Sequence, residues 1–306
     1  MHRRVILPIV AAAALFSFAP APAEAPLDVQ HVGGDVSVLI GTSCNVLILP
    51  WRGGVLIVDD QRRSNFEETL AGVRMVSDLP VRYVVDTHWH LDHSGANGLF
   101  ANAGATIVAH RNVRDRRSVE QFMAAYNQHI PPDPPGALPK LIYDNRLDLH
   151  LGAETVELRH VASAHTDGDT LVRFKKANVL AMGDVFFNHI FPFIDRSSGG
   201  SIQGLIKAVD VALAMSDDHT RIVPAHGPVA TRVELVAYRA MLNDVATGVR
   251  AQLRAERSLR DVLASHPAAA YRTGMDGEED RFVEAVYDSL KHDNLHHRLV
   301  ARRDAG

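Results

Sequence analysis

Three histidines and one aspartate fall within six consecutive residues of this chain, so its fold must let these side chains meet. The four residues are His88, His90, Asp92 and His93. They follow a short apolar run, residues 82–86, that is typical of a β-strand. In an extended chain alternate side chains point the same way, so the first three can converge while Trp89 and Leu91 face the core. Histidine with carboxylate, and no cysteine, suits zinc or another borderline divalent ion.

Three more potential ligands lie far along the chain, and each follows a predicted strand and sits near a glycine. They are His165, Asp184 and His226. Glycine lets the backbone pass close to a buried ion. We expect the ends of these strands to bring the three side chains back to the first group.

Short strands and helices alternate along the chain in two halves of similar layout. Strands are expected at residues 36–40, 46–50, 55–59, 82–86, 105–109, 141–143, 146–149, 155–160, 170–174, 179–181 and 221–223, the first three as antiparallel neighbours. Helices are expected at 64–77, with Ser64 as N-cap, at 112–127 and at 201–214. Strands and then helices, twice over, predict an α/β fold with two sheets face to face and helices outside, a four-layer αβ/βα sandwich.

Three segments are expected along the chain. Residues 1–23 form a signal peptide, 24–230 a catalytic domain, and 231–306 a helical C-terminal extension packed on the same domain. In the extension the pattern favours one long helix to about residue 264, followed by shorter helical pieces up to residue 303.

The N-terminus has the pattern of an export signal. Arg3 and Arg4 precede an apolar stretch, residues 5–18, and the small residues Ala21 and Ala23 suit cleavage after Ala23. The apolar stretch is too short to span a bilayer, so the mature chain is expected in the bacterial periplasm without an integral membrane span. An uncleaved N-terminal anchor is the alternative, and the choice between general secretory and twin-arginine export stays open.

The charge composition of the chain limits the kinds of partner that it is expected to bind. The net charge is −4 and the basic residues are scattered, whereas nucleic-acid-binding proteins carry a basic patch or stripe. We therefore expect a small-molecule substrate and no nucleic acid, and the sequence leaves the oligomeric state unspecified. Cys44 is the single cysteine, so no internal disulfide can form. It lies between apolar runs, which favours a buried small hydrophobic residue over a nucleophile.

The seven potential ligands make the sequence resemble the metallo-β-lactamase superfamily over about residues 36–228. The resemblance implies two metal sites, the first held by His88, His90 and His165, the second by Asp92, His93 and His226, with Asp184 bridging both. It also implies that Asp59 orients a ligand through a hydrogen bond. A simple turn residue is the alternative for Asp59.

An aromatic segment, residues 186–193, closely follows Asp184. An apolar loop beside a metal ligand is expected to wall the substrate pocket, and the residues we assign to this wall are Phe186, Phe187, His189 and Phe191. A buried core segment is the alternative, because runs of aromatic residues usually serve packing.

The resemblance implies a hydrolase with two zinc ions per chain, iron or manganese being possible replacements. Two such ions lower the pKa of a shared water from ~15.7 toward ~7, so that a bridging hydroxide can attack the substrate. Asp92 is assigned a catalytic role, carrying a proton to the leaving group. His90, where oxygen-reducing relatives have glutamate, favours hydrolysis over redox chemistry. Asp184 resembles the pattern of glyoxalase II, lactonases and esterases, which predicts a small ester, thioester, lactone or lactam as substrate.

Other functions remain open at this point. The main alternative is a mono-iron sulfur dioxygenase acting on a persulfide, because members of the same superfamily with that activity carry the same ligand run. A true β-lactamase and a non-catalytic metal-binding protein are the remaining alternatives. Metal analysis separates the zinc hydrolase from the mono-iron dioxygenase, since one iron per chain with oxygen uptake would eliminate the hydrolase.

Overall fold

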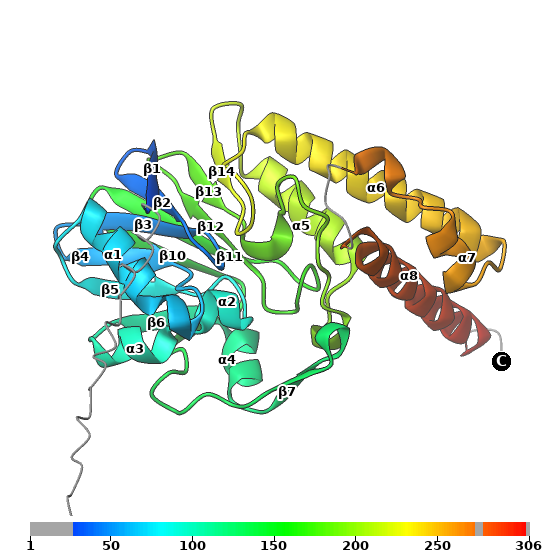
Figure 1. Ribbon diagram of the computed structural model, residues 1–306, viewed down its shortest axis with the longest axis horizontal. Helices are drawn as coiled ribbons and strands as arrows, with labels where there is room; N and C mark the ends of the chain where they lie inside the picture. Colours follow the sequence, from blue (N-terminus) through cyan, green and yellow to red (C-terminus); the bar gives the residue numbers. More distant parts are fainter. Residues whose placement is uncertain (1–26, 273–277, 304–306) are drawn as a thin grey trace, which may run out of the picture.

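Two β-sheets packed face to face, with helices on both outer surfaces, make up the molecule (Figure 1). The computed structural model describes residues 27–272 and 278–303. The first sheet contains β1 (Asp28–Gly33), β2 (Val36–Ile40), β3 (Val46–Trp51), β4 (Gly54–Val58), β5 (Val81–Val85), β6 (Thr106–His110) and β9 (Leu141–Tyr143), in that order. The second contains β10 (Arg146–Leu151), β11 (Glu154–His160), β12 (Thr170–Phe174), β13 (Val179–Ala181) and β14 (Arg221–Val223). The predicted α/β sandwich is therefore confirmed.

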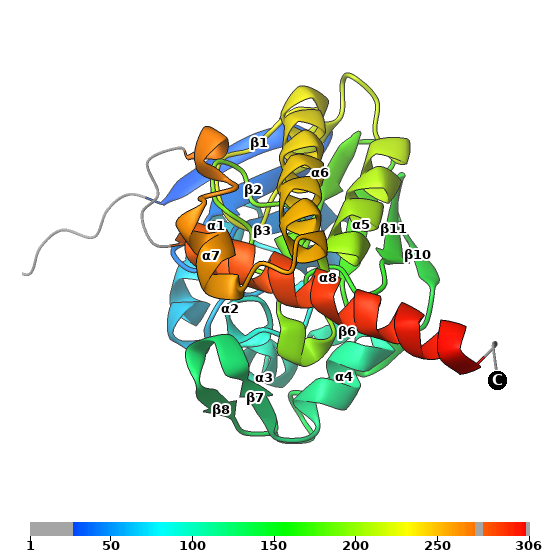
Figure 2. The same ribbon diagram turned by 90° about the vertical axis from the view of Figure 1, so that its right-hand side faces the viewer.

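Helices cover the two outer faces (Figures 1 and 2). The first sheet carries α1 (Phe66–Val76), α2 (Leu91–Ser94), α3 (Asn97–Asn102) and α4 (Arg111–Arg117). The second carries α5 (Ile202–Ala214), with α6 (Arg232–Arg254), α7 (Leu259–Ala264) and α8 (Glu278–Arg303) packed outside it. Short 3-10 turns connect the elements: η1 (Arg63–Asn65), η2 (Ala124–Tyr126), η3 (Gly183–Val185), η4 (Arg196–Ser198) and η5 (Ala269–Tyr271).

Three large apolar clusters hold the layers together, and within the described residues a smaller one surrounds Trp89, Ala109 and Val113. Between the sheets, buried residues such as Leu56 and Phe174 interdigitate. A second cluster, including Phe100 of α3, lies between the first sheet and its helices. A third joins the second sheet to α5, α6 and α8 and includes Leu205 and Leu242. Burial of such side chains is the main favourable term in folding, so the C-terminal helices are integrated into the packing of the second half.

Strand direction decides where the loops meet. β1 to β4 are antiparallel neighbours, as expected for the strands we predicted there. β4, β5 and β6 are parallel, and so are β13 and β14. Because parallel strands end at the same edge of their sheet, the segments after β4, β5, β13 and β14 all lie at one end of the sandwich.

The prediction of a single helix over residues 112–127 is wrong. The helix α4 ends at Arg117, where Gln121 Nε2 donates a hydrogen bond to the carbonyl of Arg116. The chain then forms a two-stranded hairpin, β7 (Gln121–Met123) and β8 (Gln128–Ile130), turned by η2 and by Asn127 at φ 48°. Asparagine tolerates the left-handed conformation well, which suits Asn127 to the turn of the hairpin.

Two other helix boundaries differ from expectation. The helix expected from Ser64 begins only at Phe66, after the turn η1, and Ser64 does not cap it. The long helix expected to about residue 264 ends at Arg254, because Glu256 adopts φ 56° and Ser258 opens α7 with a capping box to Asp261. The strand β1 was not predicted at all.

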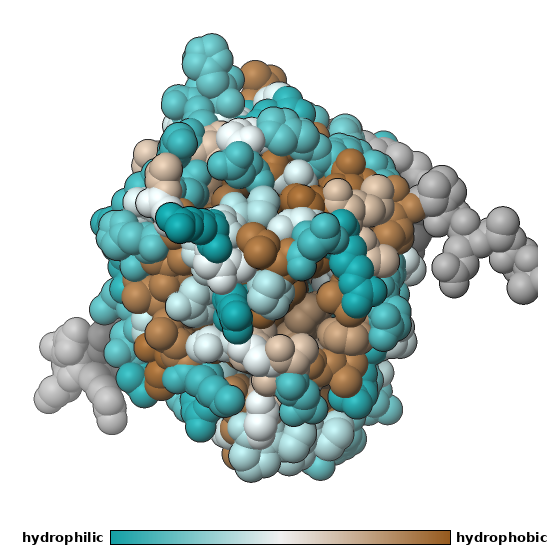
Figure 3. Space-filling view, turned by 90° about the vertical axis from the view of Figure 1, so that its left-hand side faces the viewer, coloured by the Kyte–Doolittle hydropathy of each residue, from teal (hydrophilic) through white to brown (hydrophobic). Residues whose placement is uncertain are grey.

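The predicted signal peptide, residues 1–23, lies outside the described residues, so cleavage and export stay predictions. Within residues 27–272 and 278–303, no helix combines the length and the apolar character needed to cross a bilayer. Figure 3 shows the side of the molecule on which α1 lies, where apolar residues form groups separated by hydrophilic ones.

Candidate metal centre

The seven predicted ligands meet at the end of the sandwich where the parallel strands finish. His88 follows β5, Asp184 lies in η3 after β13, and His226 follows β14. The backbone does not stay extended through the first run, because α2 begins at Leu91 and carries Asp92 and His93 on a helical turn. The expectation that Leu91 faces the core is met only in part: Leu91 is half-buried, packs against the apolar cluster that contains Trp89, and also lines the cavity beside the ligands. Trp89 is fully buried, as predicted.

One group of ligand atoms surrounds one oxygen of Asp184. His88, His90, His165 and Asp184 are all buried, and each offers an atom within 4.8 Å of the others. His165 Nε2 lies 3.0 Å from His90 Nδ1 and 3.4 Å from Asp184 Oδ2, and His88 Nε2 lies 3.8 Å from the same oxygen. These atoms therefore face a common point.

A second group surrounds the other oxygen of Asp184. His93 Nε2 and His226 Nε2 each lie 3.3 Å from Asp184 Oδ1 and 3.6 Å from Asp92 Oδ2. Asp92, His93 and His226 together satisfy the same 4.8 Å criterion as the first group. Asp184 thus presents one carboxylate oxygen to each group, which is the arrangement expected of a bridging ligand.

The donor atoms fit a metal ion. His88 Nε2 and His93 Nε2 are buried and, within the described part of the chain, have no hydrogen-bond partner. A buried polar atom left unpaired costs roughly 1–3 kcal/mol, so such atoms call for a ligand. Burial lowers the pKa of His88, as do the neighbouring histidines, which keeps its ring in the neutral form that binds metal. The structure therefore contains a buried histidine and aspartate cluster able to bind metal.

Asp59 lies behind the second group. Its carboxylate accepts hydrogen bonds from Thr87 N at 2.8 Å and Thr87 Oγ1 at 2.9 Å, and its Oδ2 lies 2.9 Å from His93 Nδ1. This contact leaves His93 Nε2 facing the cluster, as expected of a residue that orients a ligand. Cys44 is buried beside Asp59 and His93. Burial raises the pKa of its thiol, and a neutral thiol is a poor nucleophile.

One loop holds the rings of His90 and His165 in place, and the sequence did not reveal it. His90 Nε2 lies 3.0 Å from Asp195 Oδ2, and His165 Nδ1 lies 2.8 Å from the carbonyl of Phe193. These acceptors place the ring protons on the outer nitrogens and leave His90 Nδ1 and His165 Nε2 free for an ion. Burial raises the pKa of Asp195, but the hydrogen bond and charge of His90, together with hydrogen bonds from Ser197 and Ser198, lower that pKa below its usual range.

The only sequence signal for Asp195 is local. Its side chain accepts hydrogen bonds from the backbone N–H groups of Ser197 and Ser198, a pattern that an aspartate before two serines can suggest. The partner His90 is 105 residues away, and no local pattern indicates that pairing.

We expect Asp195→Ala to weaken zinc binding by about 10- to 100-fold, because His90 loses the acceptor that orients it. Zinc affinity is measured by competition with a chelator. Asp195→Asn, which keeps an acceptor, should recover part of the affinity. The matched control is Asp217→Ala, which removes another aspartate that caps a turn, with hydrogen bonds to Thr220 and His219, away from the cluster. Equal zinc affinity in the Asp195 and Asp217 variants would contradict the orienting role.

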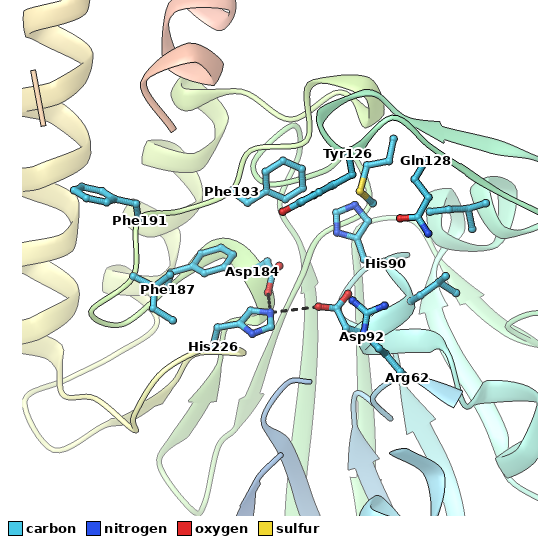
Figure 4. Close-up of a pocket in the computed structure, with 14 residues that line it drawn as sticks. Arg62, His90, Asp92, Tyr126, Gln128, Asp184, Phe187, Phe191, Phe193 and His226 are labelled. Atoms are coloured by element: carbon cyan, nitrogen blue, oxygen red, sulfur yellow. Dashed lines mark ion pairs between the residues drawn. The ribbon is translucent and has the colours of Figure 1, made fainter. Parts of the chain in front are cut away.

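A cavity of about 330 Å³ opens beside the cluster (Figure 4). Asp92, Asp184 and His226 form its polar side. The β7–β8 hairpin supplies Met123, Tyr126, Gln128 and Ile130, and the loop after Asp184 supplies Phe187, Ile190, Phe191 and Phe193. The cavity therefore joins one polar face, which carries the potential metal ligands, to largely apolar walls.

The four residues assigned to the pocket wall divide into two pairs. Phe187 and Phe191 line the cavity, whereas Phe186 is buried in the core against Tyr238, with ring centroids 4.9 Å apart. His189 is exposed at φ 61° and borders a separate hollow with Glu234 and Tyr271. The cause is the hydrogen bond from Asn188 N to the carbonyl of His226, after which the chain turns outward.

Comparison with known proteins agrees with this geometry. The profile of the Metallo-beta-lactamase superfamily matches residues 61–226, more than half of the chain. The structure is similar to a metallo-beta-lactamase from Pontibacter korlensis, with a TM-score of 0.59 and 18% identity, covering 72% of this chain and 100% of that one. It is also similar to the DIM-1 metallo-beta-lactamase, with a TM-score of 0.55, 17% identity, and coverage of 71% and 97%.

A third similar structure is larger. It is the stereoselective inverting sec-alkylsulfatase Pisa1 from Pseudomonas sp., with a TM-score of 0.60 and 15% identity over 85% of this chain. The chain spans 50% of the length of that sulfatase. At such identities the structural likeness establishes the fold, and the sequence profile establishes the family. This chain belongs to the metallo-beta-lactamase superfamily.

Proposed function

We propose that the protein is a zinc-dependent hydrolase of a small ester, thioester, lactone or lactam. The observation that carries the proposal is the position of Asp184, whose two oxygens face two separate groups of ligand atoms. Both groups lie at the cavity, because His90, Asp92 and His226 line it. A closed structural zinc site needs only four protein ligands, whereas this cluster has seven and borders a space for substrate.

Different residues around the cavity would serve different steps of the hydrolysis. Bound divalent ions would lower the pKa of water toward ~7 and polarise the scissile carbonyl. The side chain of Asp92 is 22% exposed, so it can accept a proton and pass it to a leaving group in the cavity. Phe187, Phe191 and Phe193 give the substrate an apolar surface and keep bulk water away.

Asp92, His93 and His226 form a second ligand group, which a second ion would need and a single iron would not. Because mono-iron relatives carry the same ligand run, the metal content decides between the hydrolase and the mono-iron alternative. Export to the bacterial periplasm remains part of the proposal and rests on the pattern of residues 1–23.

Metal analysis coupled to a substrate panel tests the proposal. We expect two zinc ions per chain and hydrolysis of at least one of the ester, thioester, lactone and lactam classes. Removal of zinc with a chelator should abolish that hydrolysis, and added zinc should restore it. One iron per chain with oxygen uptake on a persulfide would reject the hydrolase. A zinc-loaded protein that hydrolyses none of the four classes would reject it as well.

A further inference from the structure

An unpaired arginine stands at the rim of the cavity. Arg62 lines the cavity and is exposed, and Figure 4 shows it beside Asp92 and opposite Phe187 and Phe191. Among the described residues its guanidinium has no ion-pair or hydrogen-bond partner. Arg116 and Arg117 on α4, by contrast, are each paired with an aspartate. The charge of Arg62 is therefore available to a ligand.

The backbone that carries Arg62 is held firmly. Arg62 N donates a hydrogen bond to Ser43 Oγ at 3.2 Å. The preceding residue, Gln61, is fully buried at φ 64°, and its side chain bonds Ser43 and Thr69. On the other side the Gly95 N–H donates to the carbonyl of Gln61 at 3.1 Å. A cation on a fixed backbone loses less conformational entropy when it binds than one on a mobile loop.

The rest of the cavity indicates what this cation would meet. Its walls are largely aromatic and aliphatic, so they suit an apolar group on the substrate. Asp92 and Asp184 are committed to the metal cluster. The planar guanidinium of arginine matches the two oxygens of a carboxylate, which it can bind through two parallel hydrogen bonds.

We infer that Arg62 determines substrate specificity by binding a carboxylate on the substrate, near the scissile carbonyl. The preferred substrates are then acyl compounds that combine an apolar group with one carboxylate. This inference rests on the proposed hydrolase function for the reaction itself, but the binding of a carboxylate by Arg62 can be measured without it.

Two esters of equal length test the specificity. The monoester of glutaric acid with 4-nitrophenol carries a carboxylate where 4-nitrophenyl pentanoate has a methyl group. After subtraction of the spontaneous rate, the zinc-loaded protein should have a kcat/KM about 10-fold or more higher for the glutarate ester. In Arg62→Ala this ratio should fall to about one, and Arg62→Lys should keep part of it because the charge remains.

Binding without turnover separates this inference from the proposed function. The probes are the two ketones in which a methylene replaces the ester oxygen, titrated into the zinc-loaded protein by calorimetry. We expect the carboxylate ketone to bind about 10-fold more tightly, and Arg62→Ala to lose that preference. Arg52→Ala removes an exposed arginine from the turn between β3 and β4 and should leave both the ratio and the affinities unchanged.

The possible results of these measurements either support or overturn the assignment of Arg62 as a carboxylate-binding residue. If the wild type hydrolyses neither ester but binds the carboxylate ketone through Arg62, the anion site stands and these esters are not substrates. If the wild type binds both ketones equally, or Arg62→Ala keeps the preference, Arg62 is a solvated surface cation and the inference is overturned.

Discussion

Replacing Asp184 with alanine should reduce hydrolysis by at least about 100-fold and leave fewer than two zinc ions per chain. Loss of a residue that only orients a ligand already costs about 10- to 100-fold, and Asp184 contacts both ligand groups directly. Without its carboxylate, neither group keeps its full set of donors. Zinc content by elemental analysis and kcat/KM on the best substrate of the panel measure the effect.

The control for this variant is Asp210→Ala. Asp210 lies on α5 and pairs with Arg239 at the surface, away from the cluster. Surface ion pairs contribute little to stability, so this variant should keep two zinc ions and full activity. If Asp184→Ala also retained two zinc ions, the bridging assignment would be wrong. Circular dichroism of both variants ensures that the comparison is made on folded protein.

Gly204→Ala should destabilise the protein by about 3 kcal/mol, the upper end of the usual cost of overpacking a core. A Cβ at Gly204 would lie 1.8 Å from the carbonyl oxygen of Ser163, a distance at which backbone must move. That segment is fixed from both sides, since Ser201 Oγ donates to the same oxygen and Ser201 N donates to Ala164 O. The melting temperature should therefore fall by roughly 10 °C.

The displaced segment leads directly to His165, so we also expect weaker zinc binding in Gly204→Ala. Gly248→Ala is the matched control, because Gly248 lies within α6 and its nearest neighbour, Pro267 Cβ, is 3.9 Å from the added atom. Alanine is the better helix former, so this variant should be about 0.5–1 kcal/mol more stable. Equal melting temperatures for the two variants would show that α5 can shift without cost.

The ligand cluster could be predicted from the sequence because the residues next to each ligand form a recognisable pattern. His88, Asp184 and His226 each follow a run that reads as a strand, and strands of this kind end at a common edge. The alternation of strands and helices likewise follows from apolar periodicity, which is a local property. The ends of the helices were harder to predict, since one left-handed residue such as Glu256 ends a helix although the helical pattern of apolar residues continues beyond it.

Other features arise only from contacts between distant segments. The turn of α4 into the β7–β8 hairpin, which closes the cavity, depends on side chains that bond back to the helix end. The position of Asp195 against His90 and of Arg62 beside Asp92 depends on how separate loops pack at the end of the sandwich. His189 was assigned to the wrong hollow because a single backbone hydrogen bond turns its neighbour outward.

The amino-acid sequence by itself determined the layered α/β fold and the seven candidate ligands, because apolar periodicity and residue chemistry are local properties of the chain. The expectation that Asp59 supports one ligand came from the resemblance to a known family. Only the tertiary structure decided which oxygen of Asp184 faces which group, which loop orients His90 and His165, and which side chains line the cavity. Those outcomes depend on distances between segments that are far apart in sequence, and such distances are set by packing of the whole molecule.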